Sequence, residues 1–419
     1  MFRPSLIRGS SLDSGDVTGY GITRSRRASL SAEQRRKLSM LRSASIPLPL
    51  TPVSHIYHLV PCPRNDCNQK YVVSTDRSGD IHVHVQGIIP QPNRGDLSQQ
   101  DKRCVFLTVH DLGTNHSTMV DYVNCPAMSE IKERSCFIHI DVPGHEENSP
   151  DLPDSYQFPS LQTLGEDLIT VLDFLHIRYA VGLGEGAGAN ILARCGLAHP
   201  RRLLGLILVN CTASTSSVAD AFRSRFSRWR GADISQSEED FLIYHKFGHV
   251  SFEHERLDYN YQQISSDSGE VGERDRTLAE YRSRLRGNLN THNIKLYVRA
   301  FINRKDLILR GCQPDILLIT GMQSPYSTVI EKMYKELDKE RVTILKVDRV
   351  GDVLAEAPAK VSQSLLLFCQ GQGLLTSLPP PGVERRMSRA MSMEEYDKPN
   401  IRRLSLTPAA PDSPPHRKL

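Results

Sequence analysis

The stretch Tyr179-Ala-Val-Gly-Leu-Gly-Glu-Gly-Ala-Gly-Ala189 joins an apolar strand to a helix through a run of alternate glycines. Tyr179-Ala-Val-Gly182 has the apolar character of a buried strand. The apolar residues Ile191, Leu192, Cys195 and Leu197 then recur at helical spacing. Glycine tolerates backbone angles that other residues avoid, so the run predicts a sharp strand-to-helix turn with a closely packed backbone.

The same alternation of buried strands and helices continues on both sides of this turn. It predicts a doubly wound, mostly parallel sheet covered by helices on both faces. Residues 212–310 interrupt the alternation with polar, helical sequence, which indicates an inserted helical cap. The expected strands are Asp80–Gln86, Cys104–Val109, Cys136–Asp141, Leu204–Val209, Asp315–Thr320 and Val342–Val347, and the expected helices are 160–176 (N-capped by Ser160), 327–338 and 357–370.

Composition divides the 419 residues into three parts. Residues 1–54 and 377–419 are rich in Ser, Arg and Pro and predict two disordered basic tails around a folded domain at 55–376. Net charge is +6 over residues 1–50, +3 over 380–419 and −5 between them, for a total of +4. This total is too small to argue for nucleic-acid binding, and it makes the tails the expected place for electrostatic partners.

Cysteine usage and hydropathy predict the compartment. The nine cysteines form no Cys-x-x-Cys pair, and their odd number fits no disulfide framework. The N-terminus has no apolar secretory stretch, and the run Leu-Leu-Gly-Leu-Ile-Leu-Val at 203–209 is far shorter than the roughly 20 residues that span a bilayer. We therefore expect a soluble cytoplasmic protein.

The order of elements, with a cap before the last strands, is typical of an α/β-hydrolase fold. That fold carries its nucleophile in a Gly-x-Ser-x-Gly turn between a strand and a helix. Aligning this motif with Gly182-Leu-Gly-Glu-Gly186 puts Gly184 in the place of the serine. Ser324 stands where the acid of the triad is expected, and Asp352 stands where the histidine is expected. Serine hydrolysis needs all three groups, so the sequence predicts a degenerate triad.

Five motifs give the chain a resemblance to the N-myc downstream-regulated (NDRG) family of non-catalytic α/β-hydrolase-fold proteins. They are His110-Asp-Leu-Gly-Thr-Asn-His116, His139-Ile-Asp-Val-Pro-Gly144, Tyr156-Gln-Phe-Pro-Ser160, Gly182–Ala189 and Asn303-Arg-Lys-Asp-Leu307, within roughly 70–375. The resemblance implies a non-enzymatic signalling or scaffold protein, with a role in stress response, differentiation or trafficking, and no cofactor.

Other patterns leave alternatives open. The glycine run also fits the dinucleotide fingerprint Gly-x-Gly-x-x-Gly/Ala, but two or three strands precede it, which disfavours nucleotide binding. His110, Asp111, Gly184 and Glu185 could line a surviving pocket, or His110 could simply hold its loop in shape. An unconventional enzyme or small-ligand binder would use His110, Glu185 or Asp352. His82 and His84 share a strand face, which we expect to be solvated, and no metal-ligand spacing is recognisable.

The tails repeat one motif, two basic residues followed by any residue and a serine. It ends at Ser29, Ser39, Ser388 and Ser405, which predicts phosphorylation by a basophilic Ser/Thr kinase. Protein partners are expected, and attraction of the basic tails to an anionic membrane is the alternative.

Overall fold

The computed structural model describes residues 69–90, 92–93, 96–100, 103–214, 234–248 and 269–379. The predicted tails, apart from residues 377–379, and the four predicted phosphorylation sites lie outside these residues. The domain boundaries at 54 and 376 therefore stay predictions.

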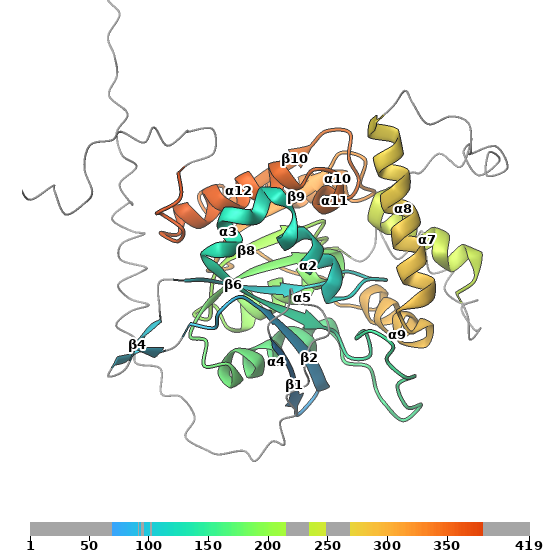
Figure 1. The fold of residues 1–419 in the computed structure, drawn as a ribbon, viewed down its shortest axis with the longest axis horizontal. Coiled ribbons are helices and arrows are strands. Elements are labelled where there is room, and N and C mark those ends of the chain that lie inside the picture. Colours follow the sequence, from blue (N-terminus) through green and yellow to red (C-terminus); the bar gives the residue numbers. More distant parts are fainter. Residues whose placement is uncertain are drawn as a thin grey trace, which may run out of the picture.

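A twisted eight-stranded sheet forms the centre of the molecule, as Figure 1 shows. Its strand order is β1-β2-β6-β5-β7-β8-β9-β10. The pairs β1–β2 and β2–β6 are antiparallel, and the other neighbours are parallel. The strands are β1 (Gln69–Thr75), β2 (Gly79–Gln86), β5 (Cys104–Val109), β6 (Ser135–Asp141), β7 (Ala180–Glu185), β8 (Leu203–Val209), β9 (Asp315–Gly321) and β10 (Val342–Val347), while β3 (Pro92–Asn93) and β4 (Asp96–Gln100) form a separate pair.

Helices cover both faces of the sheet because the central strands are apolar on both sides. In β5, Leu107 belongs to the core beneath α4 and α5, whereas Phe106 belongs to the core beneath α2, α3 and α12. The helices between the strands are α2 (His116–Asn124), the 3₁₀ turn η1 (Pro126–Met128), α3 (Ser129–Glu133), α4 (Leu161–Phe174), α5 (Gly186–Ala198), α10 (Ser327–Glu336), α11 (Val353–Glu356) and α12 (Pro358–Gly371).

Three described helices form the cap between β8 and β9: α7 (Gln236–Phe247), α8 (Gly269–Gly287) and α9 (Thr291–Ile302). They lie together on the right of Figure 1, beyond the carboxyl ends of the central parallel strands. The chain enters α7 through a capping box, in which Ser235 and Glu238 satisfy each other's free backbone N–H groups. The capping box fixes the start of α7. The C-terminal end of α7 reaches the centre of the molecule.

The predicted fold class is confirmed, and the expected strands and helices occur within a few residues of their expected bounds. The predicted N-cap is also confirmed, since Oγ of Ser160 accepts the N–H of Thr163 at 3.1 Å. Strand β1 was not expected, because Gln69–Thr75 mixes polar and apolar residues at the outer edge of the sheet.

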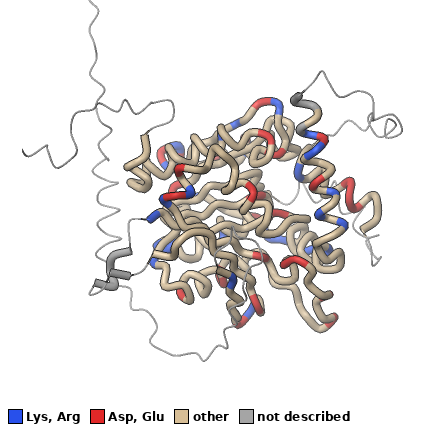
Figure 2. The backbone as a smooth tube through the Cα atoms, in the orientation of Figure 1, with Lys and Arg blue, Asp and Glu red and all other residues tan. Residues whose placement is uncertain are grey.

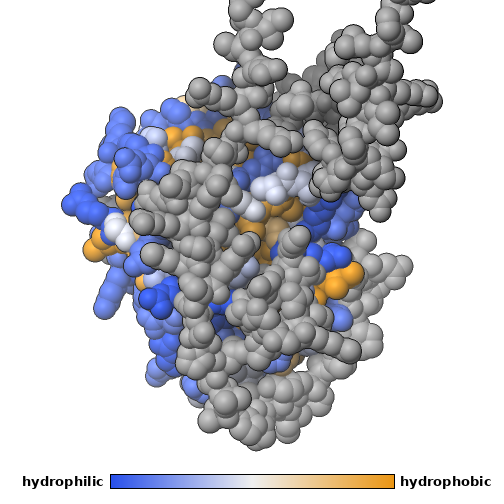
Figure 3. Space-filling model, turned by 90° about the vertical axis from the view of Figure 1, so that its left-hand side faces the viewer, coloured by the Kyte–Doolittle hydropathy of each residue, from blue (hydrophilic) through white to orange (hydrophobic). Residues whose placement is uncertain are grey.

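The surface of the described residues is mainly polar. Figure 3 shows one face as mostly blue with smaller orange areas where described residues are visible. Large exposed apolar side chains occur singly in different elements, for example Ile88 after β2, Ile308 after α9 and Leu367 on α12. None of the described helices combines the length and the apolar character needed to cross a membrane.

Candidate functional site

The sharp turn after β7 is centred on Gly186, two residues later than predicted. Gly184 lies inside the strand, paired with Val109 of β5 and Leu208 of β8. β7 ends at Glu185, and α5 begins at Gly186, whose φ is +51°. A positive φ at the strand-to-helix junction marks the nucleophile position of this fold, so the prediction that placed Gly184 there is wrong. Gly186 also lacks a side chain, and the absence of a serine nucleophile stands.

Two glycines allow the start of α5 to pack directly against the end of β5. A Cβ atom on Gly188 would lie 2.3 Å from the carbonyl oxygen of Val109. A Cβ atom on Gly186 would lie 2.0 Å from Oδ1 of Asp111. Both distances are shorter than any tolerated contact, so the carboxylate of Asp111 occupies the space of a nucleophilic side chain.

Asp111 fills the oxyanion position as well. Its Oδ1 accepts the backbone N–H of Ala187 at 2.8 Å. In active relatives, the N–H after the nucleophile stabilises the oxyanion of the substrate. Burial raises the pKa of Asp111, but the neighbouring His245 outweighs burial and lowers it to about 2. The donor is thus occupied by an ionised side chain of the protein itself.

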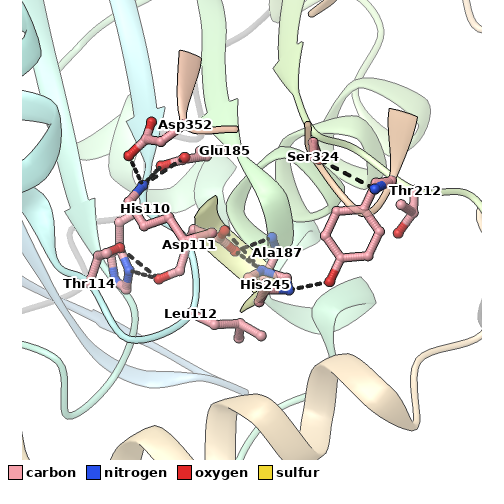
Figure 4. Close-up of polar contacts among 12 residues, drawn as sticks. His110, Asp111, Leu112, Thr114, Glu185, Ala187, Thr212, His245, Ser324 and Asp352 are labelled. Carbon is pink, nitrogen blue, oxygen red and sulfur yellow. Dashed lines mark hydrogen bonds and ion pairs between the residues drawn. The ribbon is translucent and has the colours of Figure 1, made fainter. Parts of the chain in front are cut away.

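His245 reaches this carboxylate from the cap helix α7. Its Nε2–H donates to Oδ2 of Asp111 at 2.9 Å, and its Nδ1 contacts the hydroxyl of Tyr326. Figure 4 shows the imidazole of His245 beside the carboxylate of Asp111. His245 is 1% exposed, so a cap side chain closes the centre at the strand-to-helix turn.

Lys246, the next residue of α7, forms a second buried ion cluster. Its Nζ lies 2.7 and 2.9 Å from the carboxylate oxygens of Glu185 and 3.0 Å from Oδ2 of Asp352. In Figure 4 the two carboxylates point toward one nitrogen. Burial and the nearby Asp352 and Asp111 outweigh Lys246 and raise the pKa of Glu185 to about 8. Burial lowers the pKa of Lys246, but the carboxylates, Asp352 first, raise it above its ordinary value.

The other predicted site residues have structural partners. His110 donates from Nδ1 to the carbonyl of Asp111 at 2.8 Å and accepts the N–H of Val142 on Nε2 at 3.1 Å. Asp352 caps α11 by accepting the N–H of Leu354 at 3.1 Å. Oγ of Ser324 accepts the N–H of Tyr326 at 3.3 Å. Asp111, Glu185 and Asp352 therefore do converge, but on groups that neutralise them.

The structure adds His245 and Lys246 to the predicted site, and little in the sequence pattern indicated them. They lie about 60 residues beyond the glycine turn, in a segment assigned only as a polar cap. Their partners are acidic residues at the turn and near the C-terminal end of the domain. A buried Glu185 directly before a glycine required a cation, but no local pattern indicated which one.

A second buried polar cluster corrects the prediction that His84 lies on a solvated strand face. His84 is 4% exposed because His116, at the start of α2, stacks over its ring. Its Nε2–H donates to Oδ2 of Asp141 at 3.0 Å, and Nδ1–H of His116 donates to the same oxygen at 2.8 Å. The two imidazole rings are stacked, with centroids 3.4 Å apart. His82 is partly exposed.

The described surface has a small polar recess beside the closed centre. A small recess of about 20 Å³ lies between the start of α2 and helix α8, where Thr114 and Ser117 face Arg284. Arg284 is already paired with Asp121 and Glu280. Figure 2 shows both signs of charge interspersed over the described body, including α8. The body therefore presents no large surface of one sign in this view.

Fold and site together define an α/β-hydrolase-fold protein whose elbow has no nucleophile. The chain belongs to the Ndr family, whose model matches residues 71–376. The resemblance stated from the sequence motifs is thereby confirmed.

The curated relatives cover most of the chain. It is 36% identical over 353 residues to uncharacterized protein ZK1073.1 of Caenorhabditis elegans, covering 83% of this chain and 97% of the relative. It is 30% identical to NDRG1 of Xenopus tropicalis, covering 76% and 75% of the two chains.

Solved structures share the fold at low sequence identity. An esterase from Thermogutta terrifontis matches with a TM-score of 0.53 and 14% identity, over 73% of this chain and 99% of the esterase. A hydrolase from Pseudomonas aeruginosa matches with a TM-score of 0.50 and 18% identity, over 71% and 97%. At such identities the likeness shows the fold alone.

Replacing Gly186 by alanine is expected to lower the free energy of unfolding by about 3 kcal/mol or more, because the backbone strain and the overlap with Asp111 add together. The matched control is Gly311→Ala, whose φ is also positive (+80°) but whose Cβ would meet nothing within 4 Å. Strain alone should cost it about 1–2 kcal/mol. Chemical unfolding measures both.

The overlap is tested by repeating Gly186→Ala in an Asp111→Ala background. In the absence of the Asp111 carboxylate, Gly186→Ala should lower the free energy of unfolding only as much as Gly311→Ala does. Equal costs of Gly186→Ala in both backgrounds would show that Asp111 does not fill the nucleophile position.

His145 is expected to make the protein less stable in mild acid. Its Nδ1–H donates to the carbonyl of Pro143 at 3.2 Å, and its buried Nε2 has no partner. Burial, and then the nearby His110, lower its pKa to about 3. The unfolded chain therefore takes up a proton first as the pH falls below about 6.5, and the contribution to stability is lost between there and about 3.

The measurement compares the unfolding free energies of the wild type and His145→Gln at pH 7 and pH 5. The wild type should lose roughly 2 kcal/mol more than the variant over this interval. Parallel stability curves for the two proteins would contradict the assignment of His145 as a buried neutral imidazole.

Proposed function

We propose that the protein is a non-catalytic signalling or scaffold protein of the cytoplasm, with phosphorylatable tails. The observation that carries the proposal is the centre of the fold, where Asp111 occupies the space of the nucleophile and binds the oxyanion donor. A substrate carbonyl would have to displace this ionised carboxylate from Ala187 before it could be polarised.

The cap supports the same proposal. His245 and Lys246 contact the buried carboxyl groups of Asp111, Glu185 and Asp352, so these groups of the described centre bind one another instead of facing a substrate. Removing one partner of a buried ion pair typically costs 3–5 kcal/mol, because the other charge stays buried without compensation. Opening the cap would break two such contacts at once.

The alternative is an unconventional enzyme or small-ligand binder that uses His110, Glu185 or Asp352. Convergence of Glu185 and Asp352 favours it, but both carboxylates bind Lys246. Both ring nitrogens of His110 bind the backbone. Acid–base catalysis needs a group that is free to exchange its proton with a substrate, and these contacts occupy each candidate.

Purified protein is expected to hydrolyse activated acyl esters no faster than a His245→Gln variant or buffer. Gly186→Ser should remain equally inactive, because Ser324 and Asp352 supply neither acid nor base and Asp111 blocks the new hydroxyl. The burst and the steady-state rate of nitrophenol release from an activated ester measure hydrolysis by each protein. Turnover above buffer that disappears in Glu185→Gln would favour the enzyme alternative.

The tails are proposed as the regulated part. Each phosphate adds about −1.5 to −2 charges, so four of them would reduce the summed tail charge from +9 to between about +3 and +1. Phosphorylation is therefore expected to release any electrostatic hold of the tails on an anionic membrane or an acidic partner.

The test replaces Ser29, Ser39, Ser388 and Ser405 together by Ala and, separately, by Glu. Binding to vesicles that contain phosphatidylserine should be weaker for the Glu protein than for the Ala protein, and added salt should reduce the difference. Equal vesicle binding and identical co-purifying partners for both proteins would refute regulation by phosphorylation of the tails. The function would then have to lie in the folded domain.

A further inference from the structure

The carboxylate of Asp141, at the end of β6, is buried, and no Lys or Arg among the described residues pairs with it. It is 0% exposed, and its ion-pair partners among the described residues are His84 and His116. Its Oδ1 also accepts the backbone N–H of His116 at 2.7 Å. Buried charges in proteins are paired with a cation or bind a metal ion.

Three potential metal ligands meet at this carboxylate. Nε2 of His84 and Nδ1 of His116 lie 3.0 and 2.8 Å from its Oδ2, and all three atoms lie within 4.8 Å of one another. Two imidazoles and one carboxylate, with a further position left for water, form a ligand set that zinc uses in proteins. Imidazole-rich sites favour copper and zinc over the other divalent first-row metals.

The described geometry is that of the form without metal. The rings of His84 and His116 are nearly parallel, with an interplanar angle of 8°. A metal ion lies close to the plane of each imidazole that binds it, so one ring must turn before both can bind. The side chain of His116 is 11% exposed and that of His84 is 5% exposed, which makes His116 the ring with more room.

We propose that His84, His116 and Asp141 bind a divalent transition-metal ion of the zinc class. On binding, the N–H protons that now point at Asp141 leave Nε2 of His84 and Nδ1 of His116. If a ring is neutral, its single proton moves to the nitrogen that does not bind the metal. If a ring is protonated, it loses one of its two N–H protons to solvent. The ion then compensates the charge of Asp141, and affinity falls with falling pH because protons compete for the imidazoles.

The surroundings of His84 set the expected strength. Its Nδ1 is buried and has no hydrogen-bond partner. Ligating imidazoles normally donate their second N–H to an acceptor, and loss of that contact weakens binding by about 10- to 100-fold. We therefore expect this site to bind zinc about 10- to 100-fold more weakly than a site of the same ligands in which both imidazoles donate their second N–H.

The experiment titrates full-length protein, made without a polyhistidine tag and stripped with chelator, with Co²⁺ and Zn²⁺. Visible absorption should report one Co²⁺ site that Zn²⁺ displaces, and Zn²⁺ should raise the melting temperature. His84→Gln keeps an N–H donor for Asp141 and should lose at least tenfold in affinity. His82→Gln, two residues earlier on the same strand, is the matched control and should bind like the wild type.

Equal Co²⁺ affinity in the wild type and His84→Gln would overturn the proposal and assign the cluster to a purely proton-bonded network. X-ray absorption of the zinc-loaded wild type tests the site without any variant. A zinc shell of nitrogen and oxygen with two imidazoles supports it. A shell dominated by sulfur would place the ion at cysteines instead and refute it.

Discussion

The carboxylate of Asp111 holds together three parts of the molecule that are distant in sequence. It belongs to the loop after β5, it caps the start of α5 through Ala187, and it binds His245 of the cap. The glycine run makes this possible, because only a residue without Cβ leaves room for the carboxylate above the elbow. In an active relative, the negative charge at this position is the transient oxyanion of the substrate. Here it is the permanent charge of the Asp111 carboxylate.

The ion cluster around Lys246 extends this closure toward the C-terminal end of the domain. One ammonium serves two carboxylates, Glu185 at the end of β7 and Asp352 at the start of α11. Because all three groups are almost fully buried, each depends on the others for its charge. Cap and core are therefore joined by electrostatics at the same place where an active hydrolase separates them to admit substrate.

Much of the fold could be predicted from the sequence because each buried strand is a short apolar run next to an amphipathic helix. The register of the elbow could not, because glycines at 182, 184, 186 and 188 fit the same motif in two positions. The positive backbone angle at Gly186 distinguishes the two positions.

The burial of His84 could not be predicted for a related reason. Alternating polar and apolar residues show that a strand has two faces, but they do not show that α2 covers the polar face. Contacts made by His245 and Lys246 depend on how the cap folds back, which no local pattern encodes.

Gly186 also changes the balance between stability and activity. An enzyme of this fold must keep a side chain at a positive φ, which costs of order 1–3 kcal/mol and has to be compensated elsewhere in the structure. Glycine adopts φ +51° without that steric cost. A chain that has given up the nucleophile thereby tolerates more destabilising substitutions before it unfolds. The surface of such a domain is correspondingly freer to diverge toward new partners than the surface of an enzyme that must maintain a strained elbow.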